Sequence, residues 1–249
     1  MSYIQSLFTG MSLALIVPCY NEENRLSVAE VEKLAGMEDV RVFLVNDCST
    51  DNTLELIEGI AANNSAISVI NYKQNQGKAA TIFRAYHDIN HENTLHTSYY
   101  GFLDADFSTT ADAFLELYKF ILNHNETEFI FASRIATLNS AIKRHVHRHY
   151  IGRILITLLN LKYHLGIYDT QCGAKIFGAD IAKIAFEKAF VTQWLFDIEI
   201  FLRLRAKNRL DKGFEFPLQE WRDVAGSKLA GKESVRILGD IYRLLNTYE

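Results

Sequence analysis

Proline is nearly absent from this chain of 249 residues: it occurs twice, and no low-complexity stretch, internal repeat or linker divides the sequence. The length suits one large domain, or one domain with a modest appendage. The cysteines are only three, odd in number and widely spaced, which favours reduced thiols in a cytosolic protein over a disulfide framework. No Lys or Arg precedes Arg25, and the first apolar run, residues 13–17, stops at Pro18. These features predict neither a signal peptide nor a membrane span.

Acidic residues are missing from residues 129–168, although Asp and Glu outnumber Lys and Arg in the chain as a whole. The net charge of the chain is −4, so subtracting the +6 of this stretch leaves −10 for the remainder. Segregated charge of this kind indicates an anionic partner for one region of the protein rather than a general polyanion binder. The six cationic residues are Arg134, Lys143, Arg144, Arg148, Arg153 and Lys162.

Apolar runs of strand length alternate with helical patterns through the first half of the chain. Hydrophobic residues make up 49% of the sequence and charged residues 22%, as in an ordinary globular protein with a substantial core. The alternation predicts an α/β fold, with a mainly parallel sheet covered by helices on both faces in a single domain. The expected strands are at residues 13–17, 41–45, 67–70, 99–103 and 128–132.

Polar side chains follow three of these strands. Tyr20 and Glu22 come after the first strand, Asp47 after the second, and Asp104 and Asp106 after the fourth. Ligands of open parallel sheets bind beyond the carboxyl ends of the strands, which lie along one edge. The three clusters therefore predict a single site.

Asp104 and Asp106 are candidate metal ligands. In an extended backbone, residues two apart point to the same side, so both carboxylates could face one ion. Hard oxygen ligands without a cationic partner nearby in sequence suit Mg²⁺ or Mn²⁺. The alternative is a strand end capped by Asp106, with Ser108 or Thr110 starting the next helix.

Asp197 and Glu199 lie within a strongly apolar helical stretch, residues 194–202. A carboxylate in such surroundings needs a partner or a function, and general-base catalysis is one such function. The alternative is a buried ion pair with one of three cations: Arg203, Lys175 or Lys228.

The motifs at the predicted sheet edge resemble those of family-two glycosyltransferases of the GT-A fold. In the order of that family they are residues 17–22 (VPCYNE), 46–51 (NDCSTD), 75–78 (NQGK) and 104–106 (DAD). Three further motifs resemble those of the branch that contains dolichyl-phosphate glucosyltransferase and dolichol-phosphate mannose synthase. They are residues 169–175 (DTQCGAK), 196–199 (FDIE) and 226–228 (GSK). Asn46 is a departure, because the family usually has Asp there, and it could weaken or retune donor binding.

The resemblance implies a GT-A (Rossmann-like) domain over residues 1–249. Residues from about 13 to 132 would form the half that binds the nucleotide-sugar. Residues from about 133 to 230 would form the acceptor half, and residues 231–249, which have an amphipathic pattern, a C-terminal helix.

The resemblance also implies roles at the donor site. Pro18, Tyr20, Glu22 and Asp47 would form the nucleoside pocket, where a ring can stack on the base and a carboxylate can accept its N–H. Lys78, at a helix start, would meet the ribose or the phosphates. The metal, Mg²⁺ or Mn²⁺, would be held on the donor diphosphate by Asp104 and Asp106.

At the acceptor, the resemblance places mainly cationic residues. Arg134 matches an arginine that meets phosphate in the lipid-phosphate branch, and Asp106, Arg134 and Asp197 are the candidate catalytic residues. Residues 150–161 are apolar but interrupted by charge, so they fit either a core helix or a helix in a membrane interface. The candidate acceptor-binding residues are Arg134, Arg144, Arg148, Gln171 and Lys228.

These features together favour a cytosolic inverting glycosyltransferase that can contact the cytoplasmic face of a membrane peripherally. Its donor would be a nucleoside-diphosphate sugar, UDP-glucose by the branch resemblance, and its acceptor a polyprenyl phosphate. One alternative is transfer to a hydroxyl of a glycan, lipid or small molecule, with Asp197 as general base. Another is a catalytically inactive nucleotide-sugar-binding module, which only Asn46 supports. No nucleic-acid partner is expected.

Overall fold

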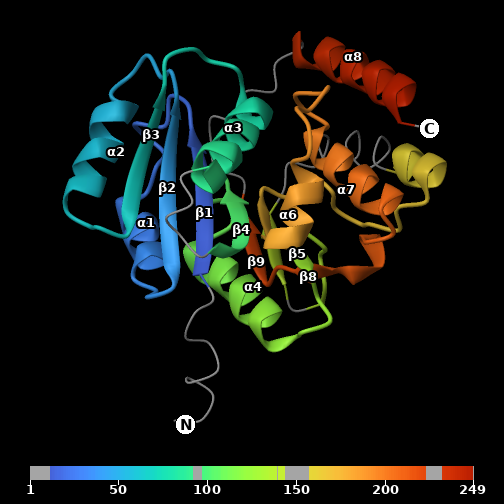
Figure 1. Ribbon diagram of the computed structural model, residues 1–249, viewed down its shortest axis with the longest axis horizontal. Helices are drawn as coiled ribbons and strands as arrows, with labels where there is room; N and C mark the ends of the chain where they lie inside the picture. Colours follow the sequence, from blue (N-terminus) through green and yellow to red (C-terminus); the bar gives the residue numbers. More distant parts are fainter. Residues whose placement is uncertain (1–11, 92–96, 139, 144–156, 223–231, 249) are drawn as a thin grey trace.

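The computed structural model describes residues 12–91, 97–138, 140–143, 157–222 and 232–248. One central sheet has the strand order β3-β2-β1-β4-β7-β5-β8, with helices on both faces (Figure 1). The predicted α/β fold with a mainly parallel sheet is confirmed. The parallel neighbours of β1 (Ser12–Cys19) are β2 (Val40–Asp47) and β4 (Thr97–Leu103), and β2 also pairs in parallel with β3 (Ile67–Tyr72).

One strand that the sequence did not reveal runs the other way. β7 (Ala174–Gly178) is antiparallel to both of its neighbours, β4 and β5 (Phe129–Ser133). β8 (Gly213–Pro217) continues the sheet in parallel with β5. The strands β7 and β8 come from residues 133–230, so the two predicted halves of the chain share one sheet. Their division into a donor half and an acceptor half remains a prediction.

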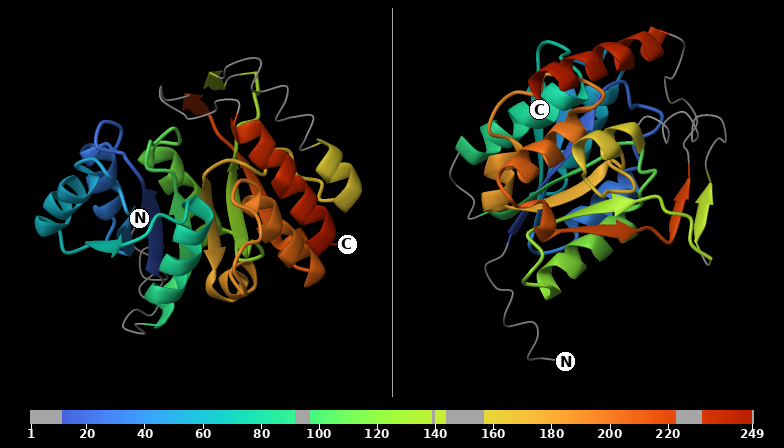
Figure 2. Two further views of the ribbon diagram at one scale, coloured as in Figure 1. Left: turned by 90° about the horizontal axis from the view of Figure 1, so that it is seen from above. Right: turned by 90° about the vertical axis from the view of Figure 1, so that its right-hand side faces the viewer.

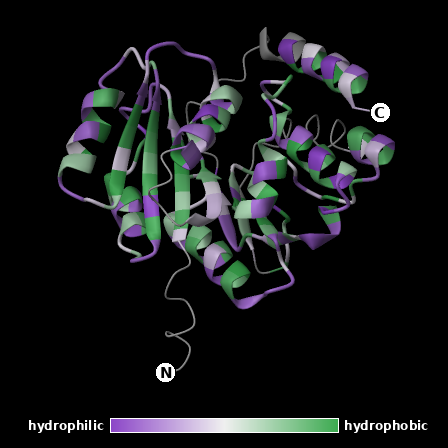
Figure 3. Cartoon of the chain, viewed as in Figure 1, coloured by the Kyte–Doolittle hydropathy of each residue, from purple (hydrophilic) through white to green (hydrophobic). Residues whose placement is uncertain are grey.

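The alternation of side chains along β1 explains why both faces of the sheet are covered. Leu13, Leu15 and Val17 join the core under one set of helices, whereas Ala14 and Ile16 join the core on the opposite face. Figure 3 shows the apolar strands between helices that carry both colours. The first set is α1 (Val28–Ala35), α2 (Thr53–Ala62) and α4 (Ala111–Asn123); the second is α3 (Lys78–His91), α6 (Ala179–Ala185), α7 (Phe196–Ala206) and α8 (Lys232–Thr247).

Local signals set the starts and ends of several helices. The Ser27 hydroxyl accepts from the Glu30 N–H at the start of α1, and Gly36 follows its last residue. Thr110 caps α4 by accepting from the Ala113 N–H at 3.2 Å. Of the two starts that the sequence offered for the helix after Asp106, Thr110 is the cap and Ser108 is not.

The C-terminal half of the chain adds smaller elements around the sheet. β6 (Ala141–Lys143) and β9 (Glu220–Arg222) form a separate parallel pair, which lies apart from the central sheet in Figure 2. A short 3-10 helix, η2 (Leu210–Lys212), precedes β8. Residues 157–163 are helical, and the amphipathic C-terminal helix predicted over 231–249 is confirmed as α8. Within the described ranges, no helix is long and apolar enough to cross a membrane.

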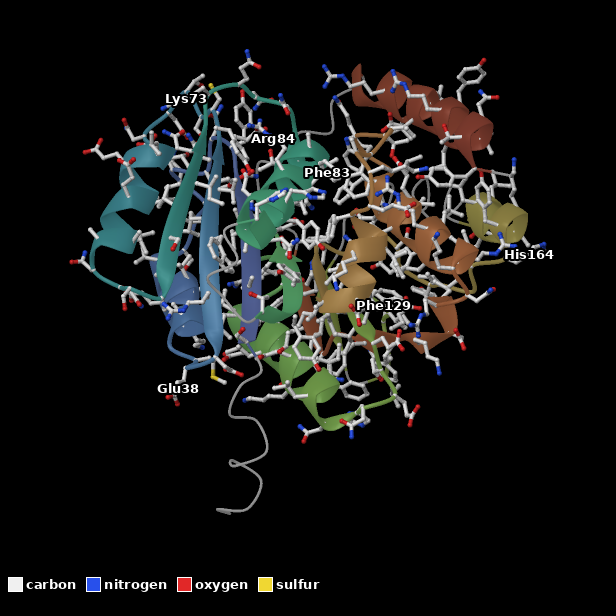
Figure 4. All side chains as sticks on the ribbon, in the orientation of Figure 1. Glu38, Lys73, Phe83, Arg84, Phe129 and His164 are labelled. Atoms are coloured by element: carbon white, nitrogen blue, oxygen red, sulfur yellow. The ribbon has the colours of Figure 1, made fainter. Side chains whose placement is uncertain are left out.

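Aromatic rings fill the core beneath α7. Phe129, labelled in Figure 4, is fully buried, with its ring centroid 6.2–6.3 Å from those of Phe131, Phe177 and Phe201. Gly213 lies directly against this ring: a Cβ atom there would be 2.1 Å from the Phe129 ring. The close approach of β8 to β5 therefore requires glycine at this position.

We predict that Gly213→Ala destabilises the fold. The added methyl must displace a ring held by three others, and overpacking of this kind costs roughly 1–3 kcal/mol. The matched control is Gly59→Ala in α2, where a Cβ meets nothing within 4 Å and the helix should gain up to about 1 kcal/mol. Urea unfolding of both variants checks the prediction, and equal midpoints would contradict it.

Candidate active site

The loops after β1 and β2 are tied together at the carboxyl edge of the sheet. The Asn21 N–H donates to the Ser49 hydroxyl at 3.1 Å, and the Thr50 N–H donates to the Asn21 side chain at 2.9 Å. The Glu22 N–H donates to the Thr53 hydroxyl at 2.7 Å. The motifs at residues 17–22 and 46–51 therefore meet, as their positions in the sequence indicated.

Tyr20 and Pro18 lie at the end of β1, where the nucleoside pocket was predicted. Pro18 is partly exposed, and Tyr20 is 37% exposed. Part of the Tyr20 residue therefore faces solvent at the sheet edge, as stacking on a base requires. The nucleoside role itself remains a prediction.

Asp47 brings the third motif to the same edge. Its buried carboxylate accepts from the backbone N–H groups of Gln76 at 3.0 Å and Gly77 at 2.8 Å. Gly77 has a φ of +84°, which glycine adopts without strain, and α3 starts at the next residue. The carboxylate thus fixes the loop that presents Lys78, while its predicted contact with a base remains a prediction.

Asn46, the departure from the family pattern, has both ends of its amide engaged. Its Oδ1 accepts from the Ser49 N–H at 3.1 Å, and its Nδ2 donates to Asn71 Oδ1 at 3.0 Å. An aspartate could accept from Ser49 but could not donate to Asn71. Asn46 therefore joins the end of β2 to β3.

The expected extended geometry of Asp104 and Asp106 is wrong. β4 ends at Leu103, and the Phe107 N–H donates back to the Asp104 carbonyl at 3.1 Å, which closes a turn. Phe107 has a φ of +49°, and the Asp106 carboxylate accepts from the Ser108 N–H at 3.0 Å. Asp106 therefore caps this turn and Thr110 starts α4, while the metal role of the two carboxylates remains a prediction.

Both carboxylates nevertheless share one neighbourhood. Together they raise the pKa of Glu22, although burial of Glu22 is the larger cause and its partner Arg25 opposes them. Among the described side chains, Glu22 Oε2 is one of the buried polar atoms with no hydrogen-bond partner. Three carboxylates from two chain segments therefore lie near one another at this part of the sheet edge.

Lys78 is the cation that sequence reasoning did not pair with the acidic motif. Its ammonium group forms an ion pair with Asp104 and lies 5.9 Å from the ring centroid of Phe102 and 5.7 Å from that of Phe196. Burial lowers the pKa of Lys78, but Asp104 and Asp197 outweigh it, and the net shift is upward. The two residues are 26 positions apart, so only the tertiary fold reveals the pair.

Gly173 forms the other wall beside Asp104. The Asp104 N–H donates to the Gly173 carbonyl at 3.0 Å, and a Cβ on Gly173 would be 2.0 Å from Asp104 Oδ2. The carboxylate packs flat on the glycine backbone, so the motif at residues 169–175 limits where Asp104 can point.

Asp104 and Asp106 can hold a hard divalent cation only if a bound phosphate and water supply further oxygen ligands. The part of the chain that the structure describes contains no group of three or more His, Cys, Asp or Glu residues arranged to hold a metal ion. Asp104 and Asp106 offer two carboxylates, and Mg²⁺ or Mn²⁺ sites with so few protein ligands are completed by substrate phosphates and water.

Arg134 is already paired within the protein. Its Nε and Nη2 atoms donate to the two Asp169 oxygens at 2.6 and 2.8 Å, and its backbone N–H donates to Oδ2 at 3.0 Å. Its guanidinium carbon also lies 5.2 Å from the ring centroid of Trp221. Asp169 is the first residue of the motif at 169–175, and the sequence did not indicate what it does. In the structure it fixes the guanidinium group of Arg134.

The remaining predicted acceptor residues divide into two groups. Gln171 lies two residues after Asp169, and its Nε2 is a buried donor without a partner among the described atoms. The hydroxyl groups of Ser133 and Thr170 are also buried without a partner among these atoms. Arg144, Arg148 and Lys228 lie outside the described residues, as does most of segment 150–161.

Asp197 pairs with Lys175, as the alternative to a catalytic role proposed. Lys175 is fully buried, and its ammonium donates to Asp197 Oδ1 at 2.6 Å and to the Cys172 carbonyl at 2.7 Å. The side chain of Asp197 is only 5% exposed. Burial raises the pKa of Asp197, and the nearby ammonium groups of Lys175 and Lys78 oppose this effect.

Glu199, on the same helix, holds neighbouring segments of the protein together. Its carboxylate accepts from the Thr192 N–H at 2.7 Å and from the Tyr248 hydroxyl at 3.0 Å, and it pairs with Arg203 at 3.4 Å. These contacts join α7 to the loop before it and to the C-terminal residues.

Comparison with known proteins identifies the family. The model of the family described as Glycosyl transferase family 2 matches residues 14–184. The chain belongs to this family. A dolichyl-phosphate beta-glucosyltransferase of Trichomonas vaginalis is 32% identical over 253 residues, covering 95% of this chain and 73% of the relative. A dolichyl-phosphate beta-glucosyltransferase of Saccharomyces cerevisiae is 27% identical, and the match covers 95% of this chain and 75% of the relative.

Solved structures share the GT-A fold of this glycosyltransferase. Glucosyl-3-phosphoglycerate synthase from Mycobacterium tuberculosis, in complex with Mn2+, UDP and glucosyl-3-phosphoglycerate, has a TM-score of 0.72 at 16% identity, covering 98% of this chain and 82% of its own. Mannosyl-3-phosphoglycerate synthase from Rubrobacter xylanophilus has a TM-score of 0.71 at 15% identity, covering 98% and 76%.

We predict that Gly173→Ala weakens the binding of UDP in the presence of Mn²⁺ at least roughly tenfold, or about 1.4 kcal/mol. The new methyl occupies the space of the Asp104 carboxylate, which must swing away. Isothermal titration measures the change, and Gly59→Ala, on the far side of the sheet, is the control. If Gly173→Ala binds UDP with unchanged affinity in the presence of Mn²⁺, the position of the Asp104 carboxylate is not important for donor binding.

Proposed function

We propose that this glycosyltransferase moves glucose from UDP-glucose to a polyprenyl phosphate with inversion at the anomeric carbon. The names of the relatives at 27–32% identity support the sugar and the acceptor class. The single structural observation that carries the acceptor assignment is the burial of Asp197 against Lys175. A phosphate monoester is already largely ionised at pH 7 and needs no base, whereas a hydroxyl does.

The donor half of the proposal rests on the convergence of residues at the sheet edge. Tyr20 stacks on the base, Asp47 holds the loop that carries Lys78, and Lys78 meets a donor phosphate. Asp104 and Asp106 hold Mg²⁺ or Mn²⁺, which neutralises charge on the departing diphosphate when it is bound. The Mn2+ and UDP in the glucosyl-3-phosphoglycerate synthase support this arrangement.

The acceptor half rests on the cationic stretch at residues 129–168. Arg134, held in a fixed orientation by its bidentate pair with Asp169, orients a phosphate oxygen of the acceptor. The further acceptor-binding residues in this proposal are Arg144, Arg148, Gln171 and Lys228. An oxygen of the acceptor phosphate attacks the anomeric carbon as the bond to UDP breaks on the opposite face. One displacement of this kind inverts the configuration.

We further propose that the reaction takes place at the cytoplasmic face of a membrane, where polyprenyl chains reside. Leu158 and Leu161 are exposed in the helical residues 157–163, and Lys162 directly follows Leu161 in sequence. Apolar side chains next to a cation are typical of surfaces that enter a lipid interface.

Asp197 distinguishes the polyprenyl phosphate from a hydroxyl acceptor. Asp197→Asn alone is a poor test, because breaking a buried ion pair typically costs 3–5 kcal/mol of stability. We therefore predict the behaviour of the double variant Lys175→Met/Asp197→Leu, which removes both charges and replaces them with apolar side chains of similar length. At saturating UDP-glucose, its kcat with polyprenyl phosphate should stay within about tenfold of wild type.

The control is the single variant Asp197→Asn, whose melting temperature should fall well below that of the double variant. If Asp197 is the general base for a hydroxyl acceptor, the well-folded double variant should lose roughly 10²–10⁴-fold in kcat. Such a loss would favour the hydroxyl reading over our proposal. Failure of the wild-type protein to release UDP with any acceptor would favour an inactive binding module.

A further inference from the structure

Contacts within the fold hold Lys78 in place, so it is not a freely rotating surface side chain. It is the first residue of α3, and the two residues before it donate their backbone N–H groups to the buried Asp47 carboxylate. The rings of Phe102 and Phe196 flank its ammonium group. The side chain as a whole is 36% exposed, so Lys78 borders solvent at the sheet edge.

Three carboxylates surround the ammonium. It pairs directly with Asp104, and Asp106 and Asp197 also favour its charged form. Asp197 is held in place by the fully buried Lys175. Charges of alternating sign therefore run from the sheet edge into the core: Asp104, Lys78, Asp197 and Lys175.

The ion pair conflicts with the metal site at Asp104. A divalent cation bound by Asp104 would lie within a few ångströms of the Lys78 ammonium, and like charges at this distance repel strongly at low dielectric. A donor diphosphate resolves the conflict because its oxygens can accept from the ammonium and also bind the metal.

We propose that Lys78 is the resident counter-cation of Asp104 and makes metal binding depend on the donor. Without donor, the ammonium neutralises Asp104 and disfavours the divalent ion. When the diphosphate enters, the ammonium transfers to a phosphate oxygen and the metal takes its place at Asp104. The metal and the donor therefore bind cooperatively, and each raises the affinity of the other by the same factor. This inference rests on the proposed metal-dependent function.

Mn²⁺ binding to the full chain tests the inference without any turnover. Free Mn²⁺ is measured by electron paramagnetic resonance, with and without saturating UDP, for the wild type, Lys78→Met and Lys78→Arg. Lys78→Met should bind Mn²⁺ at least tenfold more tightly than wild type in the absence of UDP. The factor by which UDP raises Mn²⁺ affinity should fall at least tenfold. Lys78→Arg keeps the charge and should resemble the wild type.

The matched control is Lys33→Met. Lys33 also forms an ion pair with an aspartate, Asp112 at 2.7 Å, but this pair joins α1 to α4 at the exposed surface. Its removal should leave Mn²⁺ binding unchanged. A gain equal to that of Lys78→Met would mean that lost net charge, rather than the position of Lys78, causes the effect, and it would overturn the inference.

Two further outcomes separate the inference from the proposed function. If wild type binds Mn²⁺ with UDP but Lys78→Met without UDP binds it no more tightly than wild type, the inference is wrong and the metal-dependent function stands. If neither protein binds Mn²⁺ even with UDP, both the inference and the metal assignment to Asp104 and Asp106 are wrong.

Discussion

Charge at the edge of the sheet is neutralised inside the protein, and the rest of the site depends on this constraint. A buried or half-buried ion without a partner is costly, and for several of the charges here the fold supplies a counter-ion. On our proposal, a phosphate or a metal ion that binds Lys78, Asp104 or Arg134 exchanges partners with an ion pair that already exists. The three pairs are Asp104 with Lys78, Asp197 with Lys175, and Arg134 with Asp169.

Much of the architecture could be predicted because its signals are local. Short apolar runs mark buried strands, caps such as Thr110 mark helix starts, and strands alternating with helices specify a mainly parallel sheet. Because parallel strands end at one edge, the motifs around Tyr20, Asp47 and Asp104 could be brought together without any knowledge of the structure.

The parts that could not be predicted are those decided by tertiary contacts. Nothing in residues 174–178 announces an antiparallel strand between β4 and β5, and the turn at Asp104 depends on a positive φ at Phe107. The counter-ions also lie far away in sequence: Lys175 is 22 residues from Asp197, and Asp169 is 35 residues from Arg134. Lys175 could be named from the sequence only as one of three candidate partners of Asp197, and the partners of Asp104 and Arg134 could not be found from it.

The most direct test of the account is the identity of the product. The wild-type protein is incubated with UDP-glucose, Mn²⁺ and either dolichyl phosphate or dolichol in detergent, and the fresh product is examined by mass spectrometry and by the anomeric proton signal in NMR. The account predicts a β-linked glucosyl phosphate of dolichol, one UDP released for each, and no product from dolichol. Glucosylation of dolichol, or an α-linked product from dolichyl phosphate, would contradict it.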